Sequence, residues 1–150
     1  MSYTPQSDKD VEYADDALMQ CDRVFVYGTL KKGHGNNTLL RFADYLSTTQ
    51  TVKPFVLGDV GFPYAFRQEI VPDQHKKLLF PVEGEVWKVP DLYTFIGLDG
   101  LEGFPTHYNR RIIETDSGVT AWMYMQDDWT CAQMCDACDL NKGVWKWSGR

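Results

Sequence analysis

The chain of 150 residues lacks any apolar run longer than a few residues, so no segment is predicted to span a bilayer. Its start, MSYTPQSDKD, lacks the basic and apolar parts of a secretory signal, and only four cysteines are present. We therefore expect a reduced protein in the cytoplasm with no membrane partner. Hydrophobic residues make up 43% of the chain and aromatic residues 14%, which excludes a disordered protein and predicts a sizeable core.

A stripe of basic side chains, the usual mark of a nucleic-acid-binding surface, is also missing. Lysines and arginines occur as scattered pairs at positions 31–32, 76–77 and 110–111. The net charge of −6 lies mostly in residues 1–22, which carry six acids and one base, so the remaining chain is nearly neutral. We expect no nucleic-acid partner.

The charge distribution also divides the chain. Residues 1–22 are predicted to be an acidic N-terminal extension with a mobile start, in which Val11 to Met19 could form one or two helical turns. A single domain is expected over residues 23–150, with residues 127–150 as a C-terminal tail element that contains cysteines and tryptophans.

Strand signals outnumber helix signals in this domain. Short β-rich runs predict strands at the following positions: Val24–Tyr27, Thr48–Leu57, Val82–Val89 and a hairpin of Arg111–Thr115 with Val119–Met125. Apolar spacing predicts helices at residues 39–46 and at Asp91–Leu101, the second with Asp91 as N-cap and Gly103 as C-cap. Residues 58–64, which contain two glycines and a proline, are predicted to be a loop. The fold class is α+β, with a small mixed β-barrel or curved sheet and few short helices.

The first candidate for chemistry is the turn that follows the strand Val24–Tyr27. Backbone N–H groups of Gly28, Thr29 and Leu30 leave the strand ladder there, and glycine lets the backbone approach a ligand closely. Such a cluster of donors can bind a carboxylate or an oxyanion. The alternative is an ordinary turn without a ligand.

The second candidate is Glu102, at the predicted C-terminal end of a helix. The helix dipole is negative there, and Leu98, Leu101 and Phe104 provide an apolar surround. Both factors should raise the pKa of the carboxyl, which suits a base that works near neutrality. The alternative is an exposed glutamate without such a role.

Cys131, Cys135 and Cys138 form the third candidate. Their CxxxCxxC spacing occurs in radical-SAM enzymes, but too few residues follow for the barrel that those enzymes need. A zinc site with Cys21 or a histidine as fourth ligand, or three reduced cysteines that only pack, are both open. His34, His75 and His107 stand alone in sequence, without paired metal spacing. We expect the packing role, with no metal and no cofactor.

Several ordered elements resemble the γ-glutamylcyclotransferase family in its AIG2-like branch, over roughly Val24 to Gln126. They are Tyr27-Gly28-Thr29-Leu30 with Lys31-Lys32-Gly33 and Asn36, Gly61-Phe62-Pro63, Val82-x-Gly84-Glu85-Val86, Leu98-Asp99-x-Leu101-Glu102-Gly103, and Tyr108-x-Arg110. One departure is Asn36-Asn37, where family members often carry Asn-His.

The resemblance implies an enzyme that cyclises a γ-glutamyl amide to 5-oxoproline and releases an amine or amino acid. Glu102 would be the general base and then the acid, and Tyr27, Gly28, Thr29 and Leu30 would hold the small-molecule substrate. Pocket walls would include Phe62, Tyr64 and Tyr108.

Two other functions are open. The first is a binding module that holds a γ-glutamyl-like ligand or peptide in the same cavity without turnover. The second is an interaction protein that acts through its acidic arm and through Trp145 and Trp147. The acid at position 102 favours the enzyme.

Overall fold

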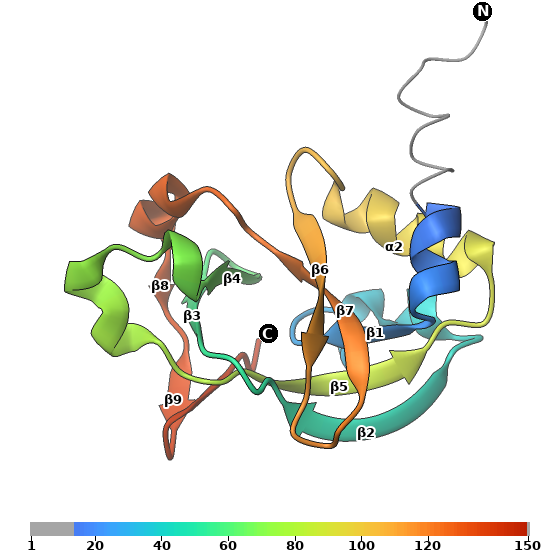
Figure 1. Cartoon of the computed structure of the whole chain (residues 1–150), viewed down its shortest axis with the longest axis horizontal. Coiled ribbons are helices and arrows are strands. Elements are labelled where there is room, and N and C mark those ends of the chain that lie inside the picture. The colour runs from blue at the N-terminus through green and yellow to red at the C-terminus, as the bar shows by residue number, and fades with distance from the viewer. Residues whose placement is uncertain (1–13, 150) are drawn as a thin grey trace, which may run out of the picture.

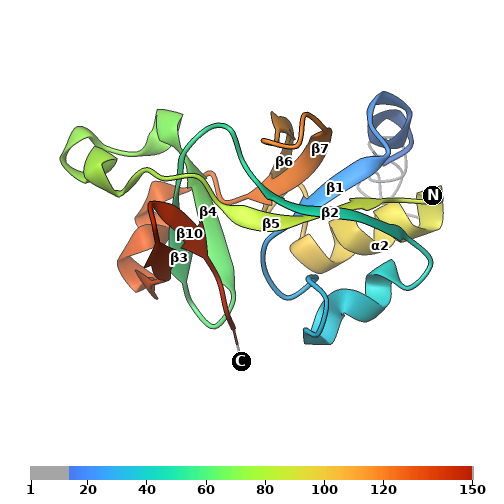
Figure 2. The same ribbon diagram turned by 90° about the horizontal axis from the view of Figure 1, so that it is seen from below.

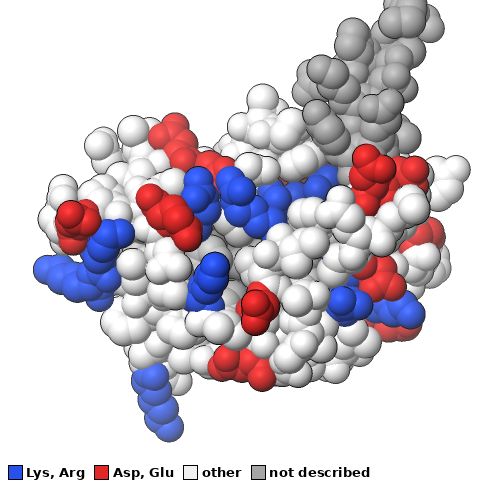
Figure 3. Space-filling model, viewed as in Figure 1, with Lys and Arg blue, Asp and Glu red and all other residues white. Residues whose placement is uncertain are grey.

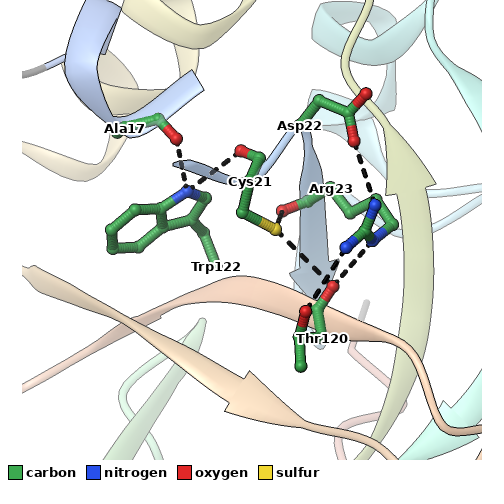
Figure 4. Close-up of polar contacts among 6 residues, drawn as sticks. All are labelled: Ala17, Cys21, Asp22, Arg23, Thr120 and Trp122. Atoms are coloured by element: carbon green, nitrogen blue, oxygen red, sulfur yellow. Dashed lines mark hydrogen bonds and ion pairs between the residues drawn. The ribbon is translucent and has the colours of Figure 1, made fainter. Parts of the chain in front are cut away.

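The computed structural model describes residues 14–149, so the expected mobile start of the N-terminal extension lies outside the described residues. Residues 14–20 are helical and pack on the domain. The indole N–H of Trp122 donates to the carbonyl oxygens of Ala17 at 3.0 Å and Cys21 at 3.1 Å (Figure 4). Next to this contact, Arg23 Nε donates to the carbonyl of Thr120 at 2.8 Å. The end of the acidic extension is therefore bound to the segment that contains Thr120 and Trp122.

A five-stranded sheet forms the larger part of the domain (Figure 1). In spatial order its strands are β2 (Asp44–Gln50), β5 (Glu83–Lys88), β1 (Arg23–Val26), β7 (Thr120–Met125) and β6 (Asn109–Glu114). β1 and β7 run parallel, with Val24 opposite Trp122, and the other neighbours are antiparallel. β1 lies in the centre of this sheet, with a strand on each edge. A strand in this position is buried on both faces, which explains why β1 is mostly apolar.

A second, smaller sheet lies on the other side of the molecule from the helix α2 (Leu92–Glu102) (Figures 1 and 2). It contains β4 (Pro63–Arg67), β3 (Phe55–Asp59) and β8 (Asp136–Ala137), in that order. β9 (Asp139–Asn141) and β10 (Val144–Lys146) form a separate hairpin. The α+β class is confirmed, and the described residues form curved sheets rather than a closed barrel.

Short 3₁₀ segments connect these strands: η1 (Gly35–Leu40), η2 (Gln68–Ile70), η3 (Asp73–Leu78) and η4 (Trp129–Met134). The helix α2 is confirmed together with both predicted caps. The Asp91 carboxylate accepts the Thr94 N–H at 2.8 Å, and Gly103 takes the left-handed conformation with φ 65°. The predicted strand over residues 82–89 and the hairpin of β6 with β7 are also present.

The predicted helix over residues 39–46 is wrong. Residues 44–50 are instead the edge strand β2, which pairs with β5 except for a register shift between Tyr45 and Ser47. The apolar spacing had suggested a buried helix face, yet Phe42 is 69% exposed and Leu46 is 45% exposed. This segment is a strand because it pairs with another strand almost forty residues away. The local spacing of apolar residues does not indicate such a distant pairing.

The predictions for residues 48–64 need two further corrections. The expected single strand Thr48–Leu57 is split into β2 and β3, because the chain turns after Thr51, whose hydroxyl donates to the carbonyl of Lys53 at 2.7 Å. The expected loop over residues 58–64 is mostly strand, since β3 and β4 form a hairpin in which Asp59 pairs with Pro63. Only the three residues between those two form the turn.

The surface of the described residues mixes both signs of charge. On the face shown in Figure 3, lysines and arginines lie in short groups next to aspartates and glutamates. Asp127 is one example, because it pairs with both Arg67 and Arg111 at 3.2 Å. No helix among residues 14–149 is long and apolar enough to cross a membrane.

Candidate functional site

A cavity of about 280 Å³ lies where the loop after β1 meets the end of α2 and the turn between β3 and β4. Seven of the eight predicted site residues line it, namely Tyr27–Leu30, Phe62, Glu102 and Tyr108. Tyr64 does not line this cavity. It is buried behind the wall, with its hydroxyl 3.4 Å from His107 Nε2 and its ring edge-to-face with Tyr108. The structure thus brings together two sequence segments that lie about seventy residues apart.

The loop that follows β1 is held by hydrogen bonds to its carbonyl and hydroxyl oxygens. The Lys31 N–H donates to the Gly28 carbonyl at 3.0 Å and closes the turn. Asn36 donates to Thr29 twice, from its backbone N–H at 3.0 Å and from Nδ2 to the hydroxyl at 2.8 Å. Asn37 Nδ2 donates to the Leu30 carbonyl at 2.8 Å.

The backbone donors of this loop are in a different situation. Within residues 14–149, the N–H groups of Gly28, Thr29 and Leu30 donate to no protein acceptor. All three residues line the cavity. Neighbouring backbone donors without a protein partner are able to bind an anion, and such a role for this loop stays a prediction.

Gly28 is needed because another strand passes close to it. A Cβ atom built on Gly28 would lie 2.7 Å from Cγ of Pro63. That distance is well below van der Waals contact, so any side chain at position 28 must displace the loop or the turn between β3 and β4. The glycine therefore allows a close approach and does not supply an unusual backbone conformation.

Glu102 is the last residue of α2 and lines the cavity. Burial, followed by the nearby charge of Asp99, raises the pKa of the Glu102 carboxyl to about 7. Within the described part of the chain, this carboxylate takes part in no hydrogen bond or ion pair. A carboxyl with this pKa exchanges its proton near neutral pH, which suits both a general base and a general acid.

A buried ion pair fixes the helix one turn before Glu102. Arg110 of β6 donates to Asp99 of α2 through two bonds of 2.9 Å, and the Tyr124 hydroxyl donates to the same carboxylate. The Asp99 and Arg110 side chains are each 5% exposed, and the guanidinium lies 3.9 Å from the ring centre of Phe104. Because paired, fork-shaped contacts set direction as well as distance, this network orients the end of α2 against the sheet.

The tyrosines around the cavity are held as neutral phenols. The Tyr27 hydroxyl donates to the Tyr124 carbonyl at 2.6 Å, and the Tyr108 hydroxyl donates to the Pro63 carbonyl at 2.9 Å. Burial raises the pKa of both groups, and the charge of Glu102 raises them further. Since their protons are engaged with backbone oxygens, these residues shape the cavity walls rather than transfer protons.

His107 and Tyr124 are among the cavity-lining residues that sequence reasoning did not name as site residues. His107 stands alone in sequence, but its backbone N–H donates to the Gly103 carbonyl at 2.8 Å, and this turn after α2 places it in the cavity lining. Tyr124 lies in β7, where five consecutive residues are buried, so no alternation marks the one that faces the cavity. For His107, the only available signal was its position four residues after the C-cap glycine.

The three cysteines of the C-terminal segment are the candidate metal ligands that the sequence raised. Residues 14–149 contain no group of three or more His, Cys, Asp or Glu side chains that could hold a metal ion. Burial, followed by the charge of neighbouring groups, raises the pKa of Cys135 to about 11 and of Cys138 to about 12. Cys135 also fills the space above Gly58, where a Cβ atom would lie 2.5 Å from it. Packing of this kind is the role expected for these cysteines from the sequence, and it stays a prediction.

The triple variant Cys131→Ser/Cys135→Ser/Cys138→Ser is therefore expected to fold, with a loss of about 1–3 kcal/mol in unfolding free energy for hydroxyls placed in partly apolar surroundings. Denaturant unfolding would measure this loss, and Cys21→Ser provides a control for a single buried thiol elsewhere. Stoichiometric zinc or iron in the purified protein, together with unfolding of the triple variant, would instead establish a structural metal site.

Comparison with known proteins places the chain in a family. The sequence profile of the family "Gamma-glutamyl cyclotransferase, AIG2-like" matches residues 24–146, and the chain belongs to this family. A Vibrio cholerae protein named "Putative gamma-glutamylcyclotransferase" is 38% identical over 106 residues, which cover 70% of this chain and 82% of that protein. A Drosophila melanogaster protein of the same descriptive name is 32% identical over 120 residues, 72% of this chain and 71% of its own length.

A solved structure shares the fold. The crystal structure of an AIG2-like protein from Mus musculus superimposes with a TM-score of 0.60 at 22% identity, covering 86% of this chain and 96% of the mouse chain. The resemblance noted in the sequence is therefore confirmed at the level of family and fold.

Proposed function

We propose that this protein is an enzyme that converts a γ-glutamyl amide to 5-oxoproline and releases the amine. The observation that carries the proposal is the cavity in which the carboxyl of Glu102, with its raised pKa, lies together with three unpaired N–H groups of Gly28, Thr29 and Leu30. One group can move protons, and the others can hold a carboxylate or an oxyanion. The family membership of the chain supports the same reaction.

The reaction needs few protein groups because the nucleophile and the electrophile belong to one molecule. The substrate's α-amino nitrogen attacks the γ-carbonyl carbon, a new carbon–nitrogen bond closes the five-membered ring, and the original amide bond breaks. The α-ammonium nitrogen must lose two protons to become the ring N–H, and the leaving nitrogen gains one to leave as the amine. Glu102 removes the first proton and delivers it to the leaving nitrogen, then removes the second from the ring nitrogen and passes it to the released amine or to solvent, so no water is consumed. Holding the substrate in a bent conformation supplies much of the acceleration.

The pH dependence of the reaction should reflect Glu102. Since the carboxylate must accept the first proton, kcat/KM is expected to rise with pH through a midpoint near 7, the raised pKa of this group. A pH–rate profile between pH 5 and 9 would measure it. A midpoint near 4.5, the ordinary glutamate value, would contradict the environment described for Glu102.

The same pKa also predicts a change in stability. Below pH 4.5 both states hold the proton, but between pH 4.5 and about 7 the unfolded state has lost it while the folded state keeps it. Stability therefore falls as pH rises through this window, by about 3 kcal/mol at most. The Glu102→Gln protein lacks this contribution. The difference between its unfolding free energy and that of the wild type should therefore increase as pH rises through this window.

The proposal is tested by measuring 5-oxoproline release from a panel of γ-glutamyl amides. Among residues 14–149, the cavity lining contains no lysine or arginine, so a second carboxylate on the leaving group would have neither of these side chains to pair with. The panel should therefore begin with amides of simple amines and extend to γ-glutamyl amino acids. Binding of these compounds without any release would indicate the non-catalytic binding module instead. The cytoplasmic location expected from the sequence remains a prediction.

A further inference from the structure

The lysine that follows the cavity loop is buried. Lys31 is only 7% exposed, whereas its neighbour Lys32 lies on the surface with its ammonium 3.4 Å from the centre of the Tyr45 ring. The Lys31 ammonium donates to the backbone carbonyl of Trp147 at 2.6 Å. A hydrogen bond of this length from an ammonium group is strong, and it joins residues 116 positions apart.

The acceptor end of this bond is itself fixed to the core. β10 pairs with β9, and the Trp145 indole N–H donates to the carbonyl oxygens of Phe55 and Leu78, each at 3.0 Å. The Trp145 backbone N–H donates to the Pro81 carbonyl at 2.8 Å. Trp147, two residues further along, is 3% exposed and packs its ring against His34. The carbonyl that receives Lys31 is thus held by several independent contacts.

Trp147 is hydrogen-bonded to the loop through its backbone carbonyl and not through its side chain. Among the described residues, Trp147 Nε1 is the only buried side-chain nitrogen or oxygen without a hydrogen-bond partner. Burial lowers the pKa of Lys31, as does the charge of Lys146, while Glu85 and Glu83 act in the opposite direction. An apolar side chain of similar length would fill the same space without the cost of desolvating an ammonium group.

Most of the other hydrogen bonds that hold the loop come from residues close to it in sequence. The carbonyl and hydroxyl oxygens of residues 28–30 are held by Lys31, Asn36 and Asn37, as described above, and all three of these follow the loop in sequence. The Lys31 side chain connects this local assembly to the C-terminal segment, and the Lys32 backbone N–H connects it to the Glu85 carboxylate of β5 at 3.0 Å. An anion site made of backbone donors depends on such fixed positions, since a misplacement of 1 Å can cost about 100-fold in rate.

We propose that Lys31 is a positioning residue, and that the C-terminal segment Val144–Trp147 acts through it as a clamp that holds the backbone donors of residues 28–30 in place. The inference rests on the proposed function for its catalytic consequence, but not for its structural one. It assigns a role to the C-terminal segment that the cavity lining alone does not reveal.

The test replaces Lys31 with methionine, which keeps the length and removes the donor, and with glutamine, which is polar but too short to span the same distance. Amide hydrogen exchange of residues 28–32 in the full chain is expected to accelerate about tenfold, while exchange in β5 and β7 and the melting temperature stay close to the wild type. With a γ-glutamyl amide that the wild type turns over, kcat/KM is expected to fall about tenfold. Lys31→Arg, which restores a cation with N–H donors, should recover part of both effects.

Lys32→Met is the matched control, because it removes a neighbouring lysine that reaches no carbonyl of the C-terminal segment. It should change neither loop exchange nor turnover. Unchanged exchange of residues 28–32 in the two Lys31 variants, or the same acceleration in Lys32→Met, would overturn the clamp. If the wild-type protein released no 5-oxoproline, the proposed function would fail, and the exchange measurement would still decide the clamp.

Discussion

Replacing Glu102 with glutamine is expected to reduce 5-oxoproline release by about 10²–10⁴-fold, the usual contribution of general acid–base catalysis. The amide preserves the shape of the side chain but cannot accept a proton from the substrate. The fold should remain intact, because within the described residues the Glu102 carboxylate forms no hydrogen bond or ion pair that the change could break. Steady-state assays with the most active amide of the panel would measure the loss.

The matched control is Glu114→Gln, since Glu114 is an exposed glutamate at the end of β6 and does not line the cavity. It should retain wild-type turnover. If Glu102→Gln kept most of its 5-oxoproline production, Glu102 would not be the base, and the proton would have to be accepted by another group.

The second large effect is expected from Gly28→Val. The new Cβ atom would overlap Pro63, since the ideal position lies 2.7 Å from Pro63 Cγ, and the two further carbons of valine add to the overlap. The loop must then shift, and its N–H groups move away from the ligand. We expect affinity for a γ-glutamyl amide to fall about 100-fold or more, in line with the sensitivity of such sites to small displacements.

Calorimetric titration in the Glu102→Gln background would measure this affinity without turnover of the ligand. Gly35→Val is a suitable control, because a Cβ atom at Gly35 would have no neighbour within 4 Å. Affinity equal to that of the parent protein in Gly28→Val would count against a ligand site lined by the loop backbone. A loss of stability much larger than the loss of affinity would point to a purely structural role for this glycine.

The elements that the sequence predicted correctly are those with local signals. The helix α2 is capped by Asp91 and Gly103, and each of these residues acts through atoms within a few positions of itself. The strand β5 and the hairpin of β6 with β7 likewise carry their apolar runs and their turn in one continuous segment. By contrast, β2 is a strand because β5 pairs with it, so a pattern typical of a helix was misleading there.

The site shows the same division. The loop at residues 27–30 and the acid at position 102 could be named from their own segments, although the role of Glu102 in catalysis remains a prediction. Tyr124 and the pairing of Asp99 with Arg110 could not, because they depend on how β6 and β7 lie against α2. Tyr64 was predicted to line the cavity but lies behind its wall. An aromatic residue beside a cavity and one behind its wall have the same sequence signature.

The central place of β1 in the large sheet also sets the order in which a newly made chain can fold. Val24 cannot pair with Trp122, its partner in the parallel pair, until nearly the whole domain has left the ribosome. Pairings between such distant strands form late because the intervening loop must close first. Until then, one edge of an apolar strand is open to other chains. A product of interrupted synthesis that ends before β7 would therefore expose an aggregation-prone edge and have an unfinished cavity, and protein quality control would be its expected fate.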